Sequence, residues 1–239
     1  PTSGSIEIFG RDAQTEGVGI RRDIGFLSSD MALDGHLTGR EQLEYFGNLR
    51  GGFDKKYVGE LASRFNCELD RRQRNLSRGN RQKVGLISAL MHKPKLLILD
   101  EPTSGLDPLI QAEFNKILLE HKAKDNTTFI SSHVLSEIQE LCDHVAFIRQ
   151  GEIVADTTID ELARSAPKQV RITSDDTKLA AAVKKLKGAS GIMAHRHGIK
   201  FAYQGEPGRL LALLSKHKMV DVSIENTDLE NTFMTFYED

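Results

Sequence analysis

Two adjacent carboxylates, Asp100 and Glu101, directly follow the apolar run Leu96–Leu99. Such a run is typical of a strand buried on both faces of a parallel sheet, and ligands of such sheets bind where strands end. Neighbouring acids repel each other unless a cation or a proton offsets their charge. A phosphate-bound Mg²⁺ suits Asp100, and Glu101 can then orient or deprotonate an attacking water. The alternative, acids stabilised by backbone amides at a helix start, stays open on this segment alone.

A second candidate is the segment Asn75–Val84, in which Ser77 and Gly79 stand at the start of an expected helix. A small residue lets the backbone approach an anion, and helix-start amides and a serine hydroxyl can donate to it. The alternative is an ordinary N-cap serine beside a solvated basic turn.

A third candidate is His133, which follows the expected strand Thr127–Ile130 and two serines. An imidazole at a strand end can donate to a phosphate oxygen and stabilise developing charge. A helix-start or surface histidine is the alternative. The order and spacing favour one common site, because Asp100 lies 20 positions after Asn80 and 33 before His133.

These candidates need a framework, and residues 1 to about 165 alternate short apolar strands with helices. Thr38 and Glu41 form a capping box at the start of one of these helices. Repeated strand–helix–strand units predict an α/β sheet covered by helices. The expected strands are 5–9, 23–27, 96–99, 127–130 and 145–148.

The pattern changes from about residue 167 onward. Strands are expected around 170–172, in a hairpin at 192–203 and at 220–224, with helices around Leu179 and Leu210. The resulting order, β-α-β-β-α-β, is the ferredoxin-like arrangement. A last helix is expected after a second capping box, Thr227–Glu230.

Together, four segments resemble motifs of the ATP-binding subunits of ABC transporters. Leu76–Asn80 is similar to the signature loop, Leu96–Glu101 to the Walker B strand, Ser104–Asp107 to the D-loop, and His133 to the switch histidine. The resemblance covers at least residues 1–160 and implies an α/β, P-loop NTPase-like ATPase core with a helical subdomain. We therefore expect an ATPase domain at 1–165, with the helical subdomain at about 30–92. A small α+β ferredoxin-like accessory domain is expected at 166–239.

The resemblance also implies ATP and Mg²⁺ as cofactors and assigns roles to individual residues. Asp100 would hold Mg²⁺ through water, Glu101 would act as general base, and His133 would contact the γ-phosphate. The signature loop would meet the nucleotide held by the opposite subunit. The ATP-binding residues implied in this way are Ser77, Arg78, Gly79 and Asn80 of the signature loop and Asp107 of the D-loop.

The sequence departs from the family's pattern in several places. Arg78 and Asn80 differ from the commonest signature loop. The family's Q-loop glutamine would fall near Ser29, which is too short to replace it, so Asp30 or a bridging water is expected to substitute.

A larger departure is that none of the 20 glycines is followed by lysine, as a phosphate loop requires. The simplest expectation is that the chain is truncated upstream of Pro1. These 239 residues alone are then expected not to bind ATP normally, whereas the parent protein would be an ATPase.

The leading functional hypothesis is an ATP-hydrolysing subunit that energises export by a separate transmembrane permease. A second ATP-binding subunit would complete a homodimer. The segment Glu225–Phe233 resembles the bacterial branch that exports drugs, antibiotics or sodium. Two alternatives stay open: a soluble ABC ATPase of DNA repair or translation, and a non-catalytic regulatory subunit, which Ser29 suggests.

Composition limits the partners and the compartment. The formal net charge is −2, which provides no net attraction to nucleic acid, and no nucleic-acid partner is expected. Cys67 and Cys142, the two cysteines of the sequence, are far apart and fit no metal or disulfide framework, which favours a reducing cytosol. No apolar run approaches the roughly 20 residues that cross a bilayer. These observations favour a cytoplasmic protein, and the resemblance to ABC transporter subunits implies that it is peripheral at the inner face of the cell membrane.

Overall fold

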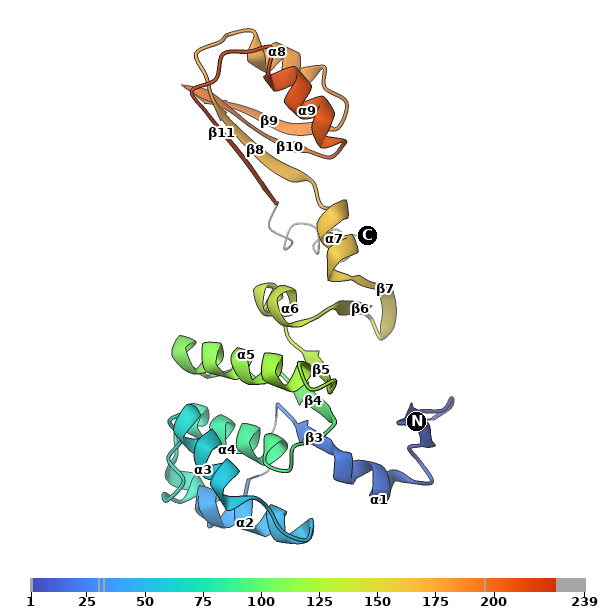
Figure 1. Ribbon diagram of the computed structural model, residues 1–239, viewed down its shortest axis with the longest axis vertical. Coiled ribbons are helices and arrows are strands. Elements are labelled where there is room, and N and C mark those ends of the chain that lie inside the picture. The colour runs from blue at the N-terminus through green and yellow to red at the C-terminus, as the bar shows by residue number, and fades with distance from the viewer. Residues whose placement is uncertain (1, 30, 32, 196, 227–239) are drawn as a thin grey trace. The chain divides into compact units, whose positions relative to one another are not determined.

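The computed structural model describes residues 2–29, 31, 33–195 and 197–226. The chain divides into two compact units, residues 1–134 and 135–239, and each is described by itself (Figure 1). The division between the two units falls after Val134. The domain boundary expected after residue 165 stays a prediction. Within the described ranges, no helix is long and apolar enough to cross a membrane.

The strands expected at 23–27, 96–99 and 127–130 form one sheet in the first unit, whereas the strand expected at 5–9 is reduced to residues 7–8, which pair antiparallel with 11–12 in a separate sheet. The elements of this unit are β1 (Glu7–Ile8), β2 (Arg11–Asp12), α1 (Gly17–Ile20), β3 (Ile24–Leu27), α2 (Gly39–Leu49), α3 (Lys55–Arg64), α4 (Arg78–Leu90), β4 (Leu96–Asp100), α5 (Pro108–Lys122) and β5 (Thr127–Ser131), with short 3₁₀ helices at Arg21–Asp23 and Gln73–Asn75. The sheet is parallel, in the order β3, β4, β5, and its register places Asp100 beside Ser131. Helices α2, α3 and α4 follow β3 before the chain returns to the sheet as β4.

Side-chain caps fix where three helices of this unit begin. Thr38 and Glu41 form the expected capping box at α2, with the Glu41 amide 3.2 Å from the Thr38 hydroxyl. Ser77 caps α4 and Asp107 caps α5, each accepting from the amide three residues later, at 3.2 and 3.1 Å. Loss of such a cap costs about 1 kcal/mol. A residue of the signature loop and a residue of the D-loop therefore each fix the start of a helix.

The burial of β4 differs from the expectation of a strand buried on both faces. Leu97 and Leu99 are buried, whereas Ile98 on the other face is half-buried. Phe26 and Phe129 are the register partners of Ile98 on the two neighbouring strands, and they are 63% and 68% exposed. The apolar run of β4 thus supplies one buried face and one apolar face that is partly open.

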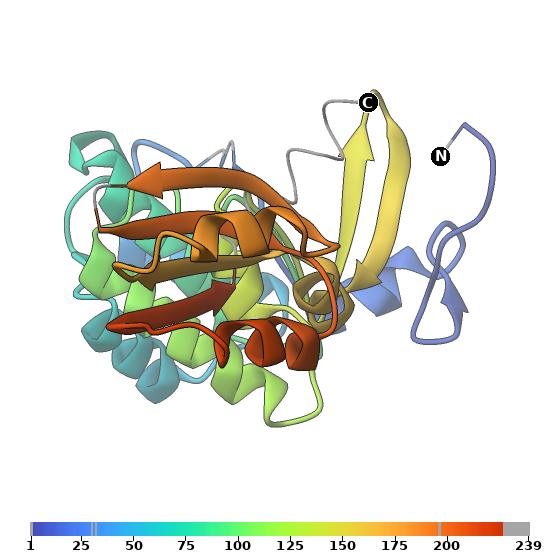
Figure 2. The same cartoon turned by 90° about the horizontal axis from the view of Figure 1, so that it is seen from above.

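The second unit contains a hairpin and a ferredoxin-like sheet. Its elements are α6 (Leu135–Leu141), β6 (His144–Arg149), β7 (Glu152–Thr158), α7 (Ile159–Ser165), β8 (Lys168–Thr173), α8 (Leu179–Lys184), β9 (Ala189–His195), β10 (Gly198–Tyr203), α9 (Pro207–Leu214) and β11 (Asp221–Asn226). The antiparallel sheet has the order β11, β8, β10, β9, which confirms the ferredoxin-like prediction. Figures 1 and 2 show α8 and α9 on the same side of this sheet.

The second unit departs from one expectation and leaves another untested. The strand expected at 145–148 forms as β6, but it pairs antiparallel with β7 rather than continuing a parallel sheet. The helix expected after the capping box Thr227–Glu230 lies outside the described residues.

The core under α8 and α9 comes from alternate residues of the strands, among them Val170, Ile172 and Phe201, all at most 1% exposed.

Candidate active site

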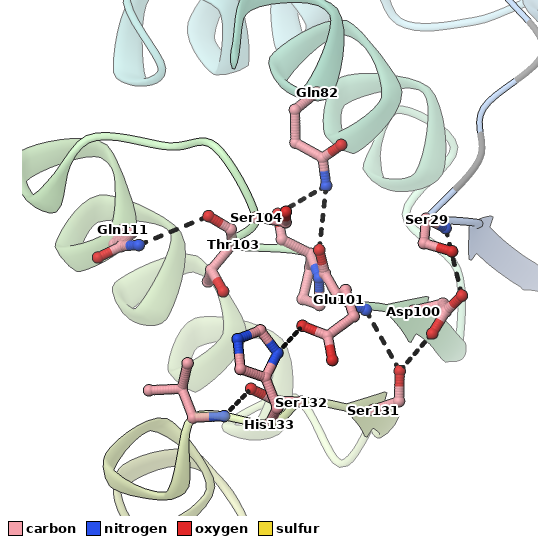
Figure 3. Close-up of polar contacts among 12 residues, drawn as sticks. Ser29, Gln82, Asp100, Glu101, Thr103, Ser104, Gln111, Ser131, Ser132 and His133 are labelled. Carbon is pink, nitrogen blue, oxygen red and sulfur yellow. Dashed lines mark hydrogen bonds and ion pairs between the residues drawn. The ribbon is translucent and has the colours of Figure 1, made fainter. Parts of the chain in front are cut away.

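Asp100 and its neighbour Ser131 form the centre of the site, at the carboxyl ends of β4 and β5. The Ser131 hydroxyl donates to Asp100 Oδ1 at 2.5 Å, and the backbone amide of Ser29 donates to Asp100 Oδ2 at 3.3 Å (Figure 3). The Ser131 hydroxyl, followed by hydrogen bonds from Ser29, holds the pKa of the Asp100 carboxyl below its ordinary value. Asp100 is therefore an ionised carboxylate at neutral pH.

Glu101 lies beside Asp100 and contacts His133. His133 Nδ1 is 2.7 Å from Glu101 Oε2 (Figure 3), and this bond requires the proton on Nδ1 because a carboxylate oxygen accepts. The Glu101 amide donates to the carbonyl and to the hydroxyl of Ser131, at 3.1 and 3.2 Å. The imidazole is 78% exposed and the carboxyl 28% exposed. The structure thus brings Asp100, Glu101 and His133 together at one edge of the sheet.

The donors at this edge suit Mg²⁺ bound together with phosphates. Among the described residues, no group of three or more His, Cys, Asp or Glu side chains could form a metal cage. Mg²⁺ keeps several waters and is commonly bound through one or two carboxylates plus substrate phosphates. The ionised oxygens of Asp100 fit that mode, and Asp100 is the residue that would hold the ion.

The signature loop lies against the D-loop of the same chain. Arg78 Nη2 donates to the Ser104 hydroxyl at 3.2 Å. A Cβ added at Gly79 would lie 2.6 Å from the carbonyl oxygen of Gly105, so only glycine allows this approach. The sequence explains Gly79 by close approach to an anion, and the structure adds close approach to the D-loop backbone. Ser77, at the exposed start of α4, is its N-cap.

The other residues implied by the resemblance have mixed surroundings. The Asn80 side chain is engaged with the backbone of Glu68, accepting from its amide at 3.0 Å and donating to its carbonyl at 2.9 Å. Asp107 uses one carboxyl oxygen to cap α5. Ser29 reaches Asp100, whereas Asp30 lies outside the described residues. The roles of these residues toward ATP stay predictions.

Sequence reasoning overlooked Gln82, a buried residue of α4. Its side-chain amide donates to the carbonyls of Pro102 and Glu101, at 2.9 and 3.3 Å. The helical spacing of Gln82, Leu86 and Ala89 could have identified this residue, because it places the glutamine on the buried face of the helix.

Comparison with known proteins agrees with this geometry. A family model described as ABC transporter matches residues 1–104. The bacitracin transport ATP-binding protein of Bacillus licheniformis is 31% identical over 242 residues, which cover 98% of this chain and 79% of that protein. The daunorubicin resistance ATP-binding protein of Streptomyces coeruleorubidus is 34% identical over 167 residues, 68% of this chain and 53% of that protein.

A solved structure agrees as well. The chain aligns with an ATP-binding subunit of an ABC transporter at a TM-score of 0.61 and 27% identity, over 69% of this chain and 70% of that one. Fold, motif order and relatives all lead to one assignment. The chain belongs to the family of ABC transporter ATP-binding proteins, whose members are ATPases.

Proposed function

We propose that this chain is the ATP-hydrolysing subunit that energises export across a bacterial membrane by a separate transmembrane permease. The observation that carries the proposal is the meeting of Asp100, Glu101 and His133 at the ends of two adjacent parallel strands. Relatives named for bacitracin transport and daunorubicin resistance support an antibiotic or drug as cargo.

In this proposal, Asp100 is the residue that would hold Mg²⁺ through water. When bound, the ion would offset the negative charge of the phosphate groups. Ser131 and Ser29 serve the site by orienting the Asp100 carboxylate and keeping it ionised. Because Ser29 donates through its backbone amide, its short side chain does not prevent this contact.

Glu101 acts as the general base in this proposal. Its carboxylate accepts the proton of the attacking water, and such bases contribute about 10²–10⁴ in rate. His133 orients that carboxylate through its 2.7 Å bond and lies exposed enough to reach a γ-phosphate oxygen. Both side chains come from segments that end adjacent strands, so the sheet itself fixes their separation.

Ser77 and Gly79 serve the nucleotide of a second subunit in this proposal. The start of α4 offers backbone amides and a hydroxyl to an anion, and no acidic side chain occupies its first turn. Each site then needs two chains, most simply two copies of this one. The 239 residues alone contain no Gly-Lys pair, and calorimetric titration should show only weak ATP binding; micromolar affinity would contradict this.

The test uses the complete native protein that contains these 239 residues, purified from detergent-solubilised membranes. We expect a polytopic membrane protein to co-purify and the complex to hydrolyse ATP. Ser77→Arg should abolish turnover and leave ATP binding by single subunits unchanged, because the introduced arginine side chain blocks only the neighbouring subunit's site. Ser63→Arg, on the exposed side of α3, is the matched control. Co-purification with ribosomes or DNA in place of a membrane protein would contradict the proposal.

A further inference from the structure

Gln82 is a buried polar residue that contacts the backbone next to the candidate base. Its side chain lies in the second turn of α4, and the residue is 5% exposed. Its side-chain amide donates to the loop after β4, to the Pro102 carbonyl at 2.9 Å and to the Glu101 carbonyl at 3.3 Å (Figure 3). Loss of this amide would remove the donor to the Pro102 carbonyl, which is costly at a buried position, whereas the Glu101 carbonyl also accepts from the Ser104 amide at 3.2 Å.

The backbone of Glu101 needs this support because its conformation is unusual. Glu101 has a φ of 47°, in the left-handed region that side chains other than glycine rarely adopt. Its amide is held by Ser131 on β5, and its carbonyl accepts from Gln82 on α4 at 3.3 Å and from the Ser104 amide at 3.2 Å. The direction of the Glu101 carboxylate is therefore set from two sides, by the sheet and by the signature helix.

The first turn of α4 contacts the same loop at two further points. Arg78 donates to the Ser104 hydroxyl, and Gly79 lies so close to the Gly105 carbonyl that a Cβ would not fit. With Gln82, these contacts cover the loop from residue 101 to residue 105. A shift of α4 along or away from this loop would thus displace the Glu101 backbone.

We propose that Gln82 is a positioning residue for Glu101, so that the general base of each subunit depends on the position of that subunit's own signature helix. This proposal rests on the proposed function, in which the same helix start meets the neighbouring subunit's nucleotide. Closure of one site would then align the base of the other site through α4 and Gln82. Communication between the two sites follows from this contact.

Gln82→Met tests the proposal because it keeps the length of the side chain and removes the amide donor. In the complete native protein we expect kcat to fall about 10- to 100-fold, since small misplacements of reacting groups have effects of this size. KM for ATP should stay within about twofold, because Gln82 touches no nucleotide group. Gln111→Met is the control: Gln111 donates to the Thr103 carbonyl of the same loop, at 3.5 Å, and its kcat should stay within about twofold.

A second readout separates positioning from a purely structural role. In the Glu101→Gln background, Gln82→Met should leave ATP-driven dimer formation unchanged, because Ser77 and the start of α4 remain intact. Gln82→Asn, whose amide is one methylene shorter, should have a kcat between those of the wild type and Gln82→Met, and it carries the test if Gln82→Met does not fold.

Three outcomes would overturn the proposal. The first is an unchanged kcat in Gln82→Met, and the second is an equal fall of kcat in Gln111→Met. The third is that Gln82→Met lowers kcat and also prevents ATP-driven dimer formation in the Glu101→Gln background. Failure of the proposed function looks different. In that case the wild type itself does not hydrolyse ATP, or Glu101→Gln hydrolyses it normally.

Discussion

Two histidine–carboxylate pairs, one in each unit, have the same separation and very different surroundings. His133 lies 2.7 Å from Glu101, and His217 lies 2.7 Å from Asp176. His133 is 78% exposed, whereas His217 is 14% exposed. The first pair stands at the open ends of parallel strands, and the second joins the segment after α9 to the loop between β8 and α8.

The polar atoms around the second pair form hydrogen bonds within the second unit. Asp176 also accepts from the Lys178 amide at 2.8 Å, and its own amide donates to the Ser174 hydroxyl at 3.0 Å. That hydroxyl donates in turn to the Lys218 carbonyl at 2.6 Å. A short histidine–carboxylate distance therefore does not identify a catalytic pair. Access for a ligand and a neighbouring charged site distinguish the pair at Glu101.

The largest effect expected from this comparison is on turnover. His133→Ala should lower the ATPase rate of the complete native protein about 10- to 100-fold, because the orientation of Glu101 and a phosphate contact are lost together. His217→Ala should leave the rate within about twofold. Steady-state hydrolysis measures both, and equal losses in the two variants would remove the distinction.

A smaller effect is expected on stability, and here His217→Ala should be affected more than His133→Ala. His217→Ala removes a partly buried hydrogen bond within the second unit and should lower its melting temperature by about 2–4 °C. His133→Ala, at an exposed position, should change the melting temperature by about 1 °C or less. Scanning calorimetry of the two variants checks this, and a larger shift for His133→Ala would argue that its pair is structural.

The smallest effect concerns acid pH. The hydrogen bond from His217 holds the pKa of the Asp176 carboxyl below its ordinary value, with help from the Lys178 amide. The ionised Asp176 carboxylate therefore makes its full contribution to the stability of the fold above about pH 4. This contribution is lost as the pH falls through the lowered pKa. In His217→Ala this loss should begin at higher pH. Urea midpoints between about pH 5 and 3 measure it; identical profiles would contradict the assignment.

The sequence was sufficient for the parts of the site that depend on regular geometry. Asp100 and Ser131 follow apolar runs, and the ends of adjacent parallel strands meet at one edge, so their proximity was predictable. The capping box at Thr38 and Glu41 depends on local spacing alone, and the structure confirms it. The alternating apolar residues after residue 167 similarly predicted the ferredoxin-like sheet.

Contacts between distant segments were not predictable in the same way. Gln82 looks like an ordinary polar helix residue until the loop after β4 is placed against it. The amide of Asn80 is used by the Glu68 backbone, 12 positions away, and no local pattern indicates that pairing. The strand β6 was located correctly, but its pairing with β7 depends on which neighbour is available and not on its own residues.

Replacing Glu101 with glutamine tests directly whether this carboxylate is the general base. In the complete native protein, Glu101→Gln should lower ATP hydrolysis by about 10²–10⁴, while ATP-driven dimers accumulate because Asp100 is unchanged. Glu60→Gln, on the exposed face of α3, is the matched control and should hydrolyse ATP normally. Near-normal turnover in Glu101→Gln would contradict the account.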